Sequence, residues 1–300
     1  MSVLNQASDG QFNILIALVR ASIRFGPRTR ADLLALCGFD LTTVENSRLN
    51  ATFLRWSELG LFEAPEGQIV IAEPYKSRLG KDVAQAEARL PTVLREIVLR
   101  EDNNLRFWEA EANKSADLTR GMAWMLAQNV YTLDTSNTAS VQRLEASQLD
   151  PTQSVIQNDT RYNALKAWMV YLGFGREGAL FTVDPTVALR WALDDLFEGD
   201  TPVSARTFLD KSCELIPVLD GGAYRRRVEA ILKESAWAAT PDGRLSTSFS
   251  RAIERLVHSG ELAIQQRADA EGGLELTGFN GRDWRAFTHI WRPKARGGAK

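Results

Sequence analysis

Apolar residues recur every three to four positions along most of the chain, a spacing that predicts helices. The first helix is predicted over residues 11–25 and ends at Gly26-Pro27. Thr29 is placed to cap a short second helix, and a capping box that begins at Thr42 opens a third helix running to about Glu58. Two short apolar runs then flank a Pro-Glu-Gly turn, so residues 61–71 are predicted to form a β-hairpin.

The same order of elements occurs twice more along the chain. The three junctions read FLRWSELGLFEAPEGQIVI, LKAWMVYLGFGREGALFTV and IERLVHSGELAIQQRADAEGGLEL, each with a helix that ends at a glycine (Gly60, Gly173 or Gly260) before a predicted hairpin. In the third, helices near 203–215 and 222–234 lead to a helix over Ser246–His258, and strands at 262–264 and 274–276 flank a polar turn. The unequal spacing of the glycines favours separate domains over a solenoid. Chance recurrence of such junctions in an α+β protein is the alternative.

Three helices followed by a hairpin is the order of a winged helix-turn-helix domain. The sequence therefore predicts a mainly α protein with short β-hairpins, in which two or three winged-helix units are joined by linker helices. The number stays open because the second hairpin is followed at once by another helix. The predicted division is a winged helix-turn-helix at 1–80, linker helices at 81–112, a second winged-helix-like unit at 113–200, a C-terminal unit at 201–292 and a basic flexible tail at 293–300.

Two resemblances to known families follow from the first part of the chain. The first 75 residues resemble winged-helix DNA-binding domains, with Thr43–Glu58 as the recognition helix and Leu61–Ile71 as the wing. The segments MSVLNQASDG, GPRTRADLLALCG and RWSELGLFE resemble DpdG, a family of accessory proteins from bacterial gene clusters that place 7-deazapurines in DNA and restrict DNA lacking them. The second resemblance implies a non-catalytic role in DNA modification and restriction, or in antiviral (phage) defence.

Charge limits nucleic-acid binding to local surfaces, because acids outnumber bases by 38 to 36. Arginine forms bidentate hydrogen bonds with guanine, and asparagine does so with adenine. The residues predicted to contact DNA in the first unit are Arg28, Arg30, Asn46, Ser47, Arg48, Asn50, Thr52 and Arg55. Those predicted in the C-terminal unit are Arg225, Arg226, Thr247, Arg251 and Arg255. For each of them, a solvated helix surface is the alternative interpretation.

The sequence lacks the complete motifs of common enzymes, and this argues against catalysis. Gly173–Gly178 spells GxGxxG, but a predicted helix precedes it and a strand follows, the reverse of the dinucleotide-binding order, so a hairpin turn is predicted. The sequence has no P-loop motif and no GxSxG motif. Cys37, Cys213, His258 and His289 lack the spacing of a zinc site. The sequence therefore predicts a non-enzyme without metal or cofactor.

Location and partners follow from the remaining patterns. No apolar run approaches the roughly 18 residues of a membrane span, and the N-terminus lacks the features of a secretory signal, so a cytoplasmic protein without membrane contact is predicted. The eight tryptophans are expected to pack mainly in the core. The leading hypothesis is an accessory protein that binds double-stranded DNA. The alternative is a winged-helix scaffold that docks a helicase or DNA-modifying enzyme without contacting DNA.

Overall fold

The protein divides into two compact units. The computed structural model describes residues 3–4, 12–38, 44–109, 114–199, 201–268 and 272–293, without the side chains of residues 44–47 and 283. The N-terminal unit comprises residues 1–119 and 157–172, and the C-terminal unit comprises residues 120–156 and 173–300. This division differs from the predicted boundaries at residues 80, 112 and 200. The predicted basic tail falls almost entirely outside the described residues.

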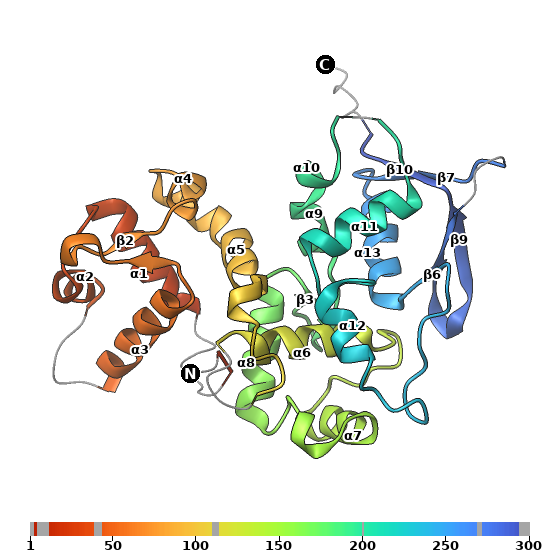
Figure 1. Ribbon diagram of the computed structural model, residues 1–300, viewed down its shortest axis with the longest axis horizontal. Helices are drawn as coiled ribbons and strands as arrows, with labels where there is room; N and C mark the ends of the chain where they lie inside the picture. Colours follow the sequence, from red (N-terminus) through yellow and green to blue (C-terminus); the bar gives the residue numbers. More distant parts are fainter. Residues whose placement is uncertain are drawn as a thin grey trace. The chain divides into compact units, whose positions relative to one another are not determined.

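Helices make up most of the N-terminal unit (Figure 1). Its helices are α1 (Phe12–Phe25), α2 (Arg30–Leu36), α3 (Val44–Glu58), α4 (Tyr75–Leu79), α5 (Val83–Leu99), the start of α6 (Ala116–Ala127) and α8 (Asp159–Tyr171), with 3₁₀ turns at Pro65–Gly67 and Glu101–Asn103. The Thr29 hydroxyl accepts a hydrogen bond from the Asp32 amide, as a cap of α2 should. Thr42 and Thr43, predicted to cap α3, lie outside the described residues.

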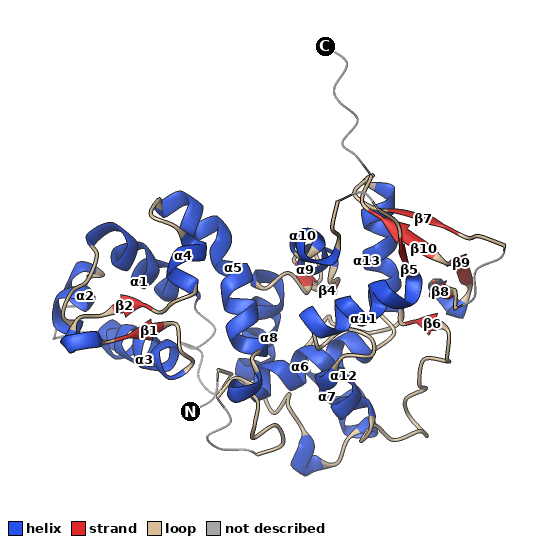
Figure 2. Cartoon of the chain, turned by 45° about the horizontal axis from the view of Figure 1, so that its top comes forward, coloured by secondary structure: helices blue, strands red, loops and turns tan. Residues whose placement is uncertain are grey.

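The predicted hairpin at residues 61–71 is confirmed as an antiparallel strand pair. Strand β1 (Phe62–Glu63) pairs with β2 (Val70–Ile71), with Phe62 opposite Ile71. An isolated antiparallel bridge joins Arg28 to Ile69, so the segment between α1 and α2 continues the pairing beyond β2. Figure 2 shows β1 and β2 beside α3.

Long-range aromatic contacts place α8 in the N-terminal core. Trp56 of α3 lies with its ring centroid 5.6 Å from that of Trp168. Phe12 of α1 stacks on Tyr171, with 4.2 Å between centroids and 11° between planes. Trp56 and Trp168 are both buried, as expected for core tryptophans. Residues of α8 therefore complete the core of a unit that begins about 150 positions earlier in the chain.

The C-terminal unit combines helices with short strands (Figure 2). Its elements after α6 are α7 (Thr138–Gln148), a 3₁₀ turn at Pro151–Gln153, β3 (Gly175–Arg176), β4 (Thr182–Val183), α9 (Thr186–Trp191), α10 (Leu193–Leu196), β5 (Val203–Ser204), α11 (Ala205–Leu215), α12 (Ala223–Glu229), β6 (Arg244–Leu245), α13 (Thr247–His258), β7 (Ala263–Gln265), β8 (Leu274–Thr277), a 3₁₀ turn at Phe279–Gly281, β9 (Asp283–Phe287) and β10 (His289–Trp291). The predicted helices near residues 115–131, 138–147 and 246–258 are confirmed. Among the described residues, no helix has both the length and the apolar character that crossing a membrane requires.

The strand pairing predicted after α13 is wrong. Strand β7 pairs with β10 in the sheet β5-β10-β7, and β8 pairs with β9 in the sheet β6-β8-β9, where β6 and β8 run parallel. The chain reverses between β8 and β9 at Gly278–Arg282, where the Gly278 amide donates a 2.7 Å hydrogen bond to the Arg282 carbonyl. Asn280 and Gly281 both have positive φ, a conformation that Asn-Gly adopts at little cost in hairpin turns.

The GxGxxG segment forms part of a hairpin, as predicted. Helix α8 precedes it, and β3 pairs antiparallel with β4, with Gly175 opposite Val183. Gly173 has a φ of +89°, and a Cβ at this position would lie 2.7 Å from the Ala188 amide nitrogen. Glycine is therefore required here by both backbone conformation and the close approach of α9.

Candidate nucleic-acid interface

The first half of α3 carries polar residues predicted to contact DNA. Arg48 is exposed and Asn50 is half-buried, whereas the side chains of Asn46 and Ser47 lie outside the described part of the chain. Helix α3 packs on α1 and β1, and its second half also meets Trp168 through Trp56. The apolar contacts thus concentrate toward the C-terminal end and leave Arg48 in solvent.

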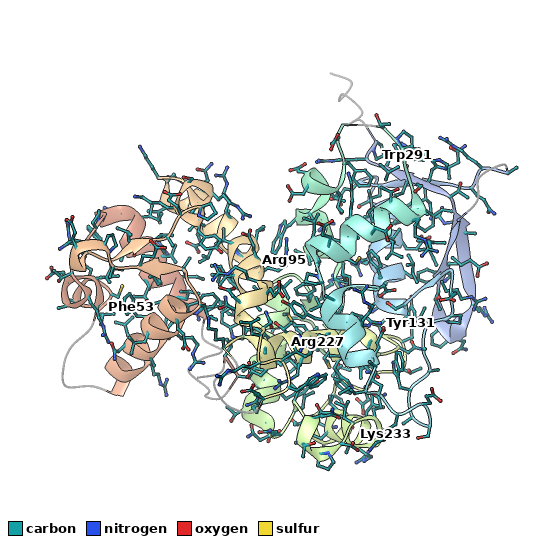
Figure 3. All side chains as sticks on the ribbon, viewed as in Figure 1. Phe53, Arg95, Tyr131, Arg227, Lys233 and Trp291 are labelled. Carbon is teal, nitrogen blue, oxygen red and sulfur yellow. The ribbon has the colours of Figure 1, made fainter. Side chains whose placement is uncertain are left out.

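Helix α2 contributes a second arginine to this surface. Arg30, at the first position of α2, donates a hydrogen bond through Nη2 to the Asn50 side-chain carbonyl. Its guanidinium carbon lies 5.5 Å from the centroid of the Phe53 ring, a cation–π distance (Figure 3 labels Phe53). Arg28 is also exposed, and its Nη1 donates to the Pro27 carbonyl at 2.9 Å. The structure therefore brings Arg30 and Asn50 together, and Arg48 is exposed one half-turn earlier on α3.

Two candidates on α3 are not on the surface. Arg55 is only 6% exposed, and Thr52 is buried as well. The helical period predicts both on the polar side of a helix packed on one face, but α3 contacts α1 and β1, and its second half also meets Trp168 of α8. The expectation that Arg55 and Thr52 are available to a ligand is therefore wrong. Leu36 of α2 and Leu54 of α3 are exposed although both are apolar.

The arginines of α12 differ although they are adjacent in sequence. Arg225 is 1% exposed. Its Nε donates a 2.6 Å hydrogen bond to Glu229, and its Nη1 lies 3.5 Å from an Asp220 carboxylate oxygen. Arg226 is exposed and donates to the Gly221 carbonyl. Arg225 is therefore an internal ion-pair residue rather than a surface contact, which corrects its predicted placement.

Internal hydrogen bonds occupy the polar face of α13. Thr247 is buried, and its hydroxyl accepts a 3.0 Å hydrogen bond from the Val130 amide. The guanidinium carbon of Arg251 lies 4.8 Å from the ring centroid of Tyr131. The segment after α6 thus covers the face of α13 that the sequence analysis expected to be open, and Thr247 is not accessible.

Arg255 is exposed but forms an ion pair with a buried carboxylate. Its Nη1 lies 3.2 Å from Asp184 Oδ2, and Nη1 of Arg176 lies 3.9 Å from the same oxygen. The Asp184 carboxylate is almost fully buried, and its Oδ1 accepts a 3.0 Å hydrogen bond from the Thr186 amide. Because a buried carboxylate needs compensating charge, Arg255 stabilises the fold at this site.

Two exposed aromatic residues were not foreseen. Phe279 and Trp284 flank the turn between β8 and β9 and are 52% and 41% exposed. The sequence analysis expected Trp284 in the core. The Asn280-Gly281 pair between them is the signal that could have identified a hairpin tip, where side chains tend to be exposed. Among the described side chains, no three His, Cys, Asp or Glu residues gather as a metal-binding group.

The fold and this surface define a mainly helical protein with short β-strand pairs and an exposed arginine–asparagine cluster on α2 and α3. A family model described as DpdG-like matches residues 1–270, and the chain belongs to this family. Membership suggests an accessory role in a DNA modification cluster. The match extends the resemblance noted at the start of the chain over most of its length. Comparisons with curated proteins and with solved structures found no match.

Proposed function

We propose that this chain is a non-enzymatic accessory protein that binds double-stranded DNA through its N-terminal unit, in a DNA modification, restriction or antiviral defence system. Family membership supports the accessory role. The observation that carries the DNA-binding part is the exposed Arg48 in the first half of α3, together with the hydrogen-bonded pair Arg30 and Asn50 that joins α2 to the same half of the helix. These residue types read guanine and adenine edges in the major groove.

The order of elements supports a winged-helix interpretation of this unit. Helix α1, the bridge at Arg28, α2, α3, β1 and β2 follow one another, and the bridge lies next to β2. Helix α3 then takes the position of the recognition helix, which reads bases mainly through residues near its N-terminus. Arg48 and Asn50 lie in that half of α3, and the exposed Arg28 is placed to contact phosphate.

The C-terminal unit repeats this order without an open recognition face. Strand β5, α11, α13, β7 and β10 occur in this order, with α12 and β6 inserted before α13 and β8 and β9 inserted before β10, and the strand order is β5-β10-β7. Thr247 is tied to Val130, and Arg255 is paired with Asp184. We therefore assign duplex binding to the N-terminal unit alone.

A protein-docking scaffold is the second candidate. Leu36 of α2 and Leu54 of α3 are exposed on the two helices that carry the arginines. Exposed leucines near a basic surface suit a partner protein as well as DNA. A helicase or a DNA-modifying enzyme is the kind of partner this hypothesis implies.

The test is duplex binding by the full chain with Arg48→Ala. Fluorescence anisotropy with a labelled duplex should show affinity reduced by about 5- to 150-fold, because a bidentate base contact is worth about 1–3 kcal/mol. Arg28→Ala should instead make the slope of log affinity against log salt less negative by about 0.9, the value for one phosphate contact. Arg106→Ala is the matched control, because it removes an exposed arginine that pairs with Glu109 outside this surface.

Two results would reject the DNA-binding proposal. One is equal duplex affinity for Arg48→Ala, Arg106→Ala and the unmodified chain. The other is absence of duplex binding at low salt while the chain co-purifies with a partner enzyme. In that case, loss of co-purification in Leu54→Ala would favour the docking scaffold.

A further inference from the structure

An aromatic cluster is exposed at the β8–β9 turn of the C-terminal unit. The ring centroid of Tyr131 lies 5.7 Å from that of Phe279 and 6.0 Å from that of Trp284, with planes inclined by 85° and 76°. Tyr131 follows α6 and is labelled in Figure 3. Edge-to-face contacts of this kind are favourable and fix ring orientation. Tyr131 therefore holds two rings that remain about half exposed.

The turn itself orients Trp284. A Cβ added to Gly278 would lie 2.1 Å from the Trp284 indole nitrogen, so the indole packs directly against the glycine backbone. Positive φ angles at Asn280 and Gly281 set the reversal of the chain. The indole thus occupies a position that only glycine at residue 278 allows. Because the Trp284 side chain is already held there, it loses little conformational entropy when a ligand binds.

Arginines lie against Tyr131 and within the turn that carries Phe279 and Trp284. Arg251 lies over Tyr131, and Arg282 is exposed within the turn. Arg285 follows Trp284 and donates two 2.9 Å hydrogen bonds to Glu254, which neutralises its charge. Arg251 and Arg282 therefore leave a cationic environment beside exposed aromatic faces.

We propose that Phe279 and Trp284 form a stacking site for the unpaired bases of a single-stranded nucleic acid. Proteins that bind single strands combine exposed aromatic rings with cationic side chains that follow the phosphates. Arg251 and Arg282 favour a polyanionic strand over an apolar protein surface. The site belongs to the C-terminal unit, so it is separate from the duplex surface of α2 and α3 and goes beyond the proposed function.

The experiment measures binding of the full chain to a fluorescein-labelled twelve-nucleotide oligothymidine by anisotropy. Trp284→Ala and Phe279→Ala should each weaken binding by about tenfold, within the range for loss of one stacked base. Trp284→Phe should retain most of the affinity, because a flat ring remains. Gly278→Ala should weaken binding although both rings are present, since the new methyl group displaces the indole. The matched control is Leu180→Ala, which removes an equally exposed apolar side chain of the same unit.

Three outcomes would overturn the stacking site: no oligothymidine binding by the unmodified chain, unchanged binding in both alanine variants, or equal weakening in Leu180→Ala. Near-UV circular dichroism checks that the variants fold, and Phe279→Ala serves where Trp284→Ala does not. Duplex binding separates this proposal from the proposed function. Trp284→Ala should leave duplex affinity unchanged, whereas Arg48→Ala should leave oligothymidine affinity unchanged.

Discussion

Helices α3 and α13 hold the same place in two similar orders of elements, yet their polar residues have different environments. In the first half of α3, Arg48 is exposed and Asn50 is half-buried. On α13, Thr247 bonds to Val130 and Ser248 donates a 2.8 Å hydrogen bond to the Leu126 carbonyl. The place of a helix in this order of elements therefore does not by itself make its polar residues accessible. What covers it, here the segment after α6, decides whether a ligand has access.

The largest expected effect is on the free energy of unfolding, and it tests whether a buried arginine of the C-terminal unit stabilises the fold. Arg225→Ala should lower the free energy of unfolding by about 3 kcal/mol, because it leaves the Asp220 carboxylate without its buried cation. Asp220 also accepts a 2.6 Å hydrogen bond from the Ser246 hydroxyl at the start of α13, so the helix is affected too. The measurement is urea unfolding followed by tryptophan fluorescence.

Arg226→Ala is the control for this effect, because it removes the neighbouring arginine, which is exposed. It should change the unfolding free energy by less than about 0.5 kcal/mol. Equal effects of the two substitutions would show that Arg225 is not an internal ion-pair residue. The C-terminal unit would then resemble the N-terminal unit in having arginine available for a ligand.

A smaller effect compares buried hydroxyl groups on the two helices. Ser248→Ala removes the hydrogen bond to Leu126 and should cost about 1–2 kcal/mol. The Thr52 hydroxyl on α3 is buried and has no hydrogen-bond partner among the described residues. Thr52→Val replaces it with a methyl group and should be neutral or stabilising, because an unsatisfied polar group is removed. Thermal unfolding of both variants measures the difference. Destabilisation by Thr52→Val equal to that of Ser248→Ala would contradict the comparison.

Features that depend on neighbouring residues could be predicted from the sequence. The Thr29 cap, the helix that begins after Ser246 and the β1–β2 pair each depend on residues a few positions apart. Arg48 could be predicted as a candidate because its place on the helix depends only on neighbouring residues and its chemistry only on the residue itself.

Features that depend on distant partners could not be predicted. The burial of Arg55 follows from packing around the second half of α3, where Trp168 arrives from more than 100 positions away. Strand β7 pairs with β10 although β8 is nearer in sequence, and β8 pairs instead with β9 across the Asn280-Gly281 turn. The exposure of Trp284 could not be predicted for the same reason, because periodicity does not show which turn joins two paired strands.

The smallest effect concerns the ends of α3 and α13, where the two regions are alike. After α3, Arg100 donates to the Leu59 carbonyl at 3.4 Å and pairs with Asp102 at 2.6 Å. After α13, Arg190 of α9 donates hydrogen bonds of 2.6 and 2.9 Å to Glu261. In each pair, the hydrogen bonds from the arginine lower the pKa of the carboxyl group. Both helix ends are therefore fixed by an arginine–carboxylate pair.

Because each carboxyl pKa is lower in the folded chain, each pair stabilises the fold fully above the ordinary carboxyl pKa. That stabilisation is lost as the pH falls through the lowered value. Both pairs are partly exposed, so Asp102→Asn and Glu261→Gln should each cost only about 0.5 kcal/mol at pH 7. Melting temperatures measured at decreasing pH from pH 7 should show the gap between each variant and the unmodified chain narrowing in acid. A gap in one variant that stays constant as the pH falls would show that its helix end depends on packing rather than on charge, and the likeness of the two regions would then fail at that end.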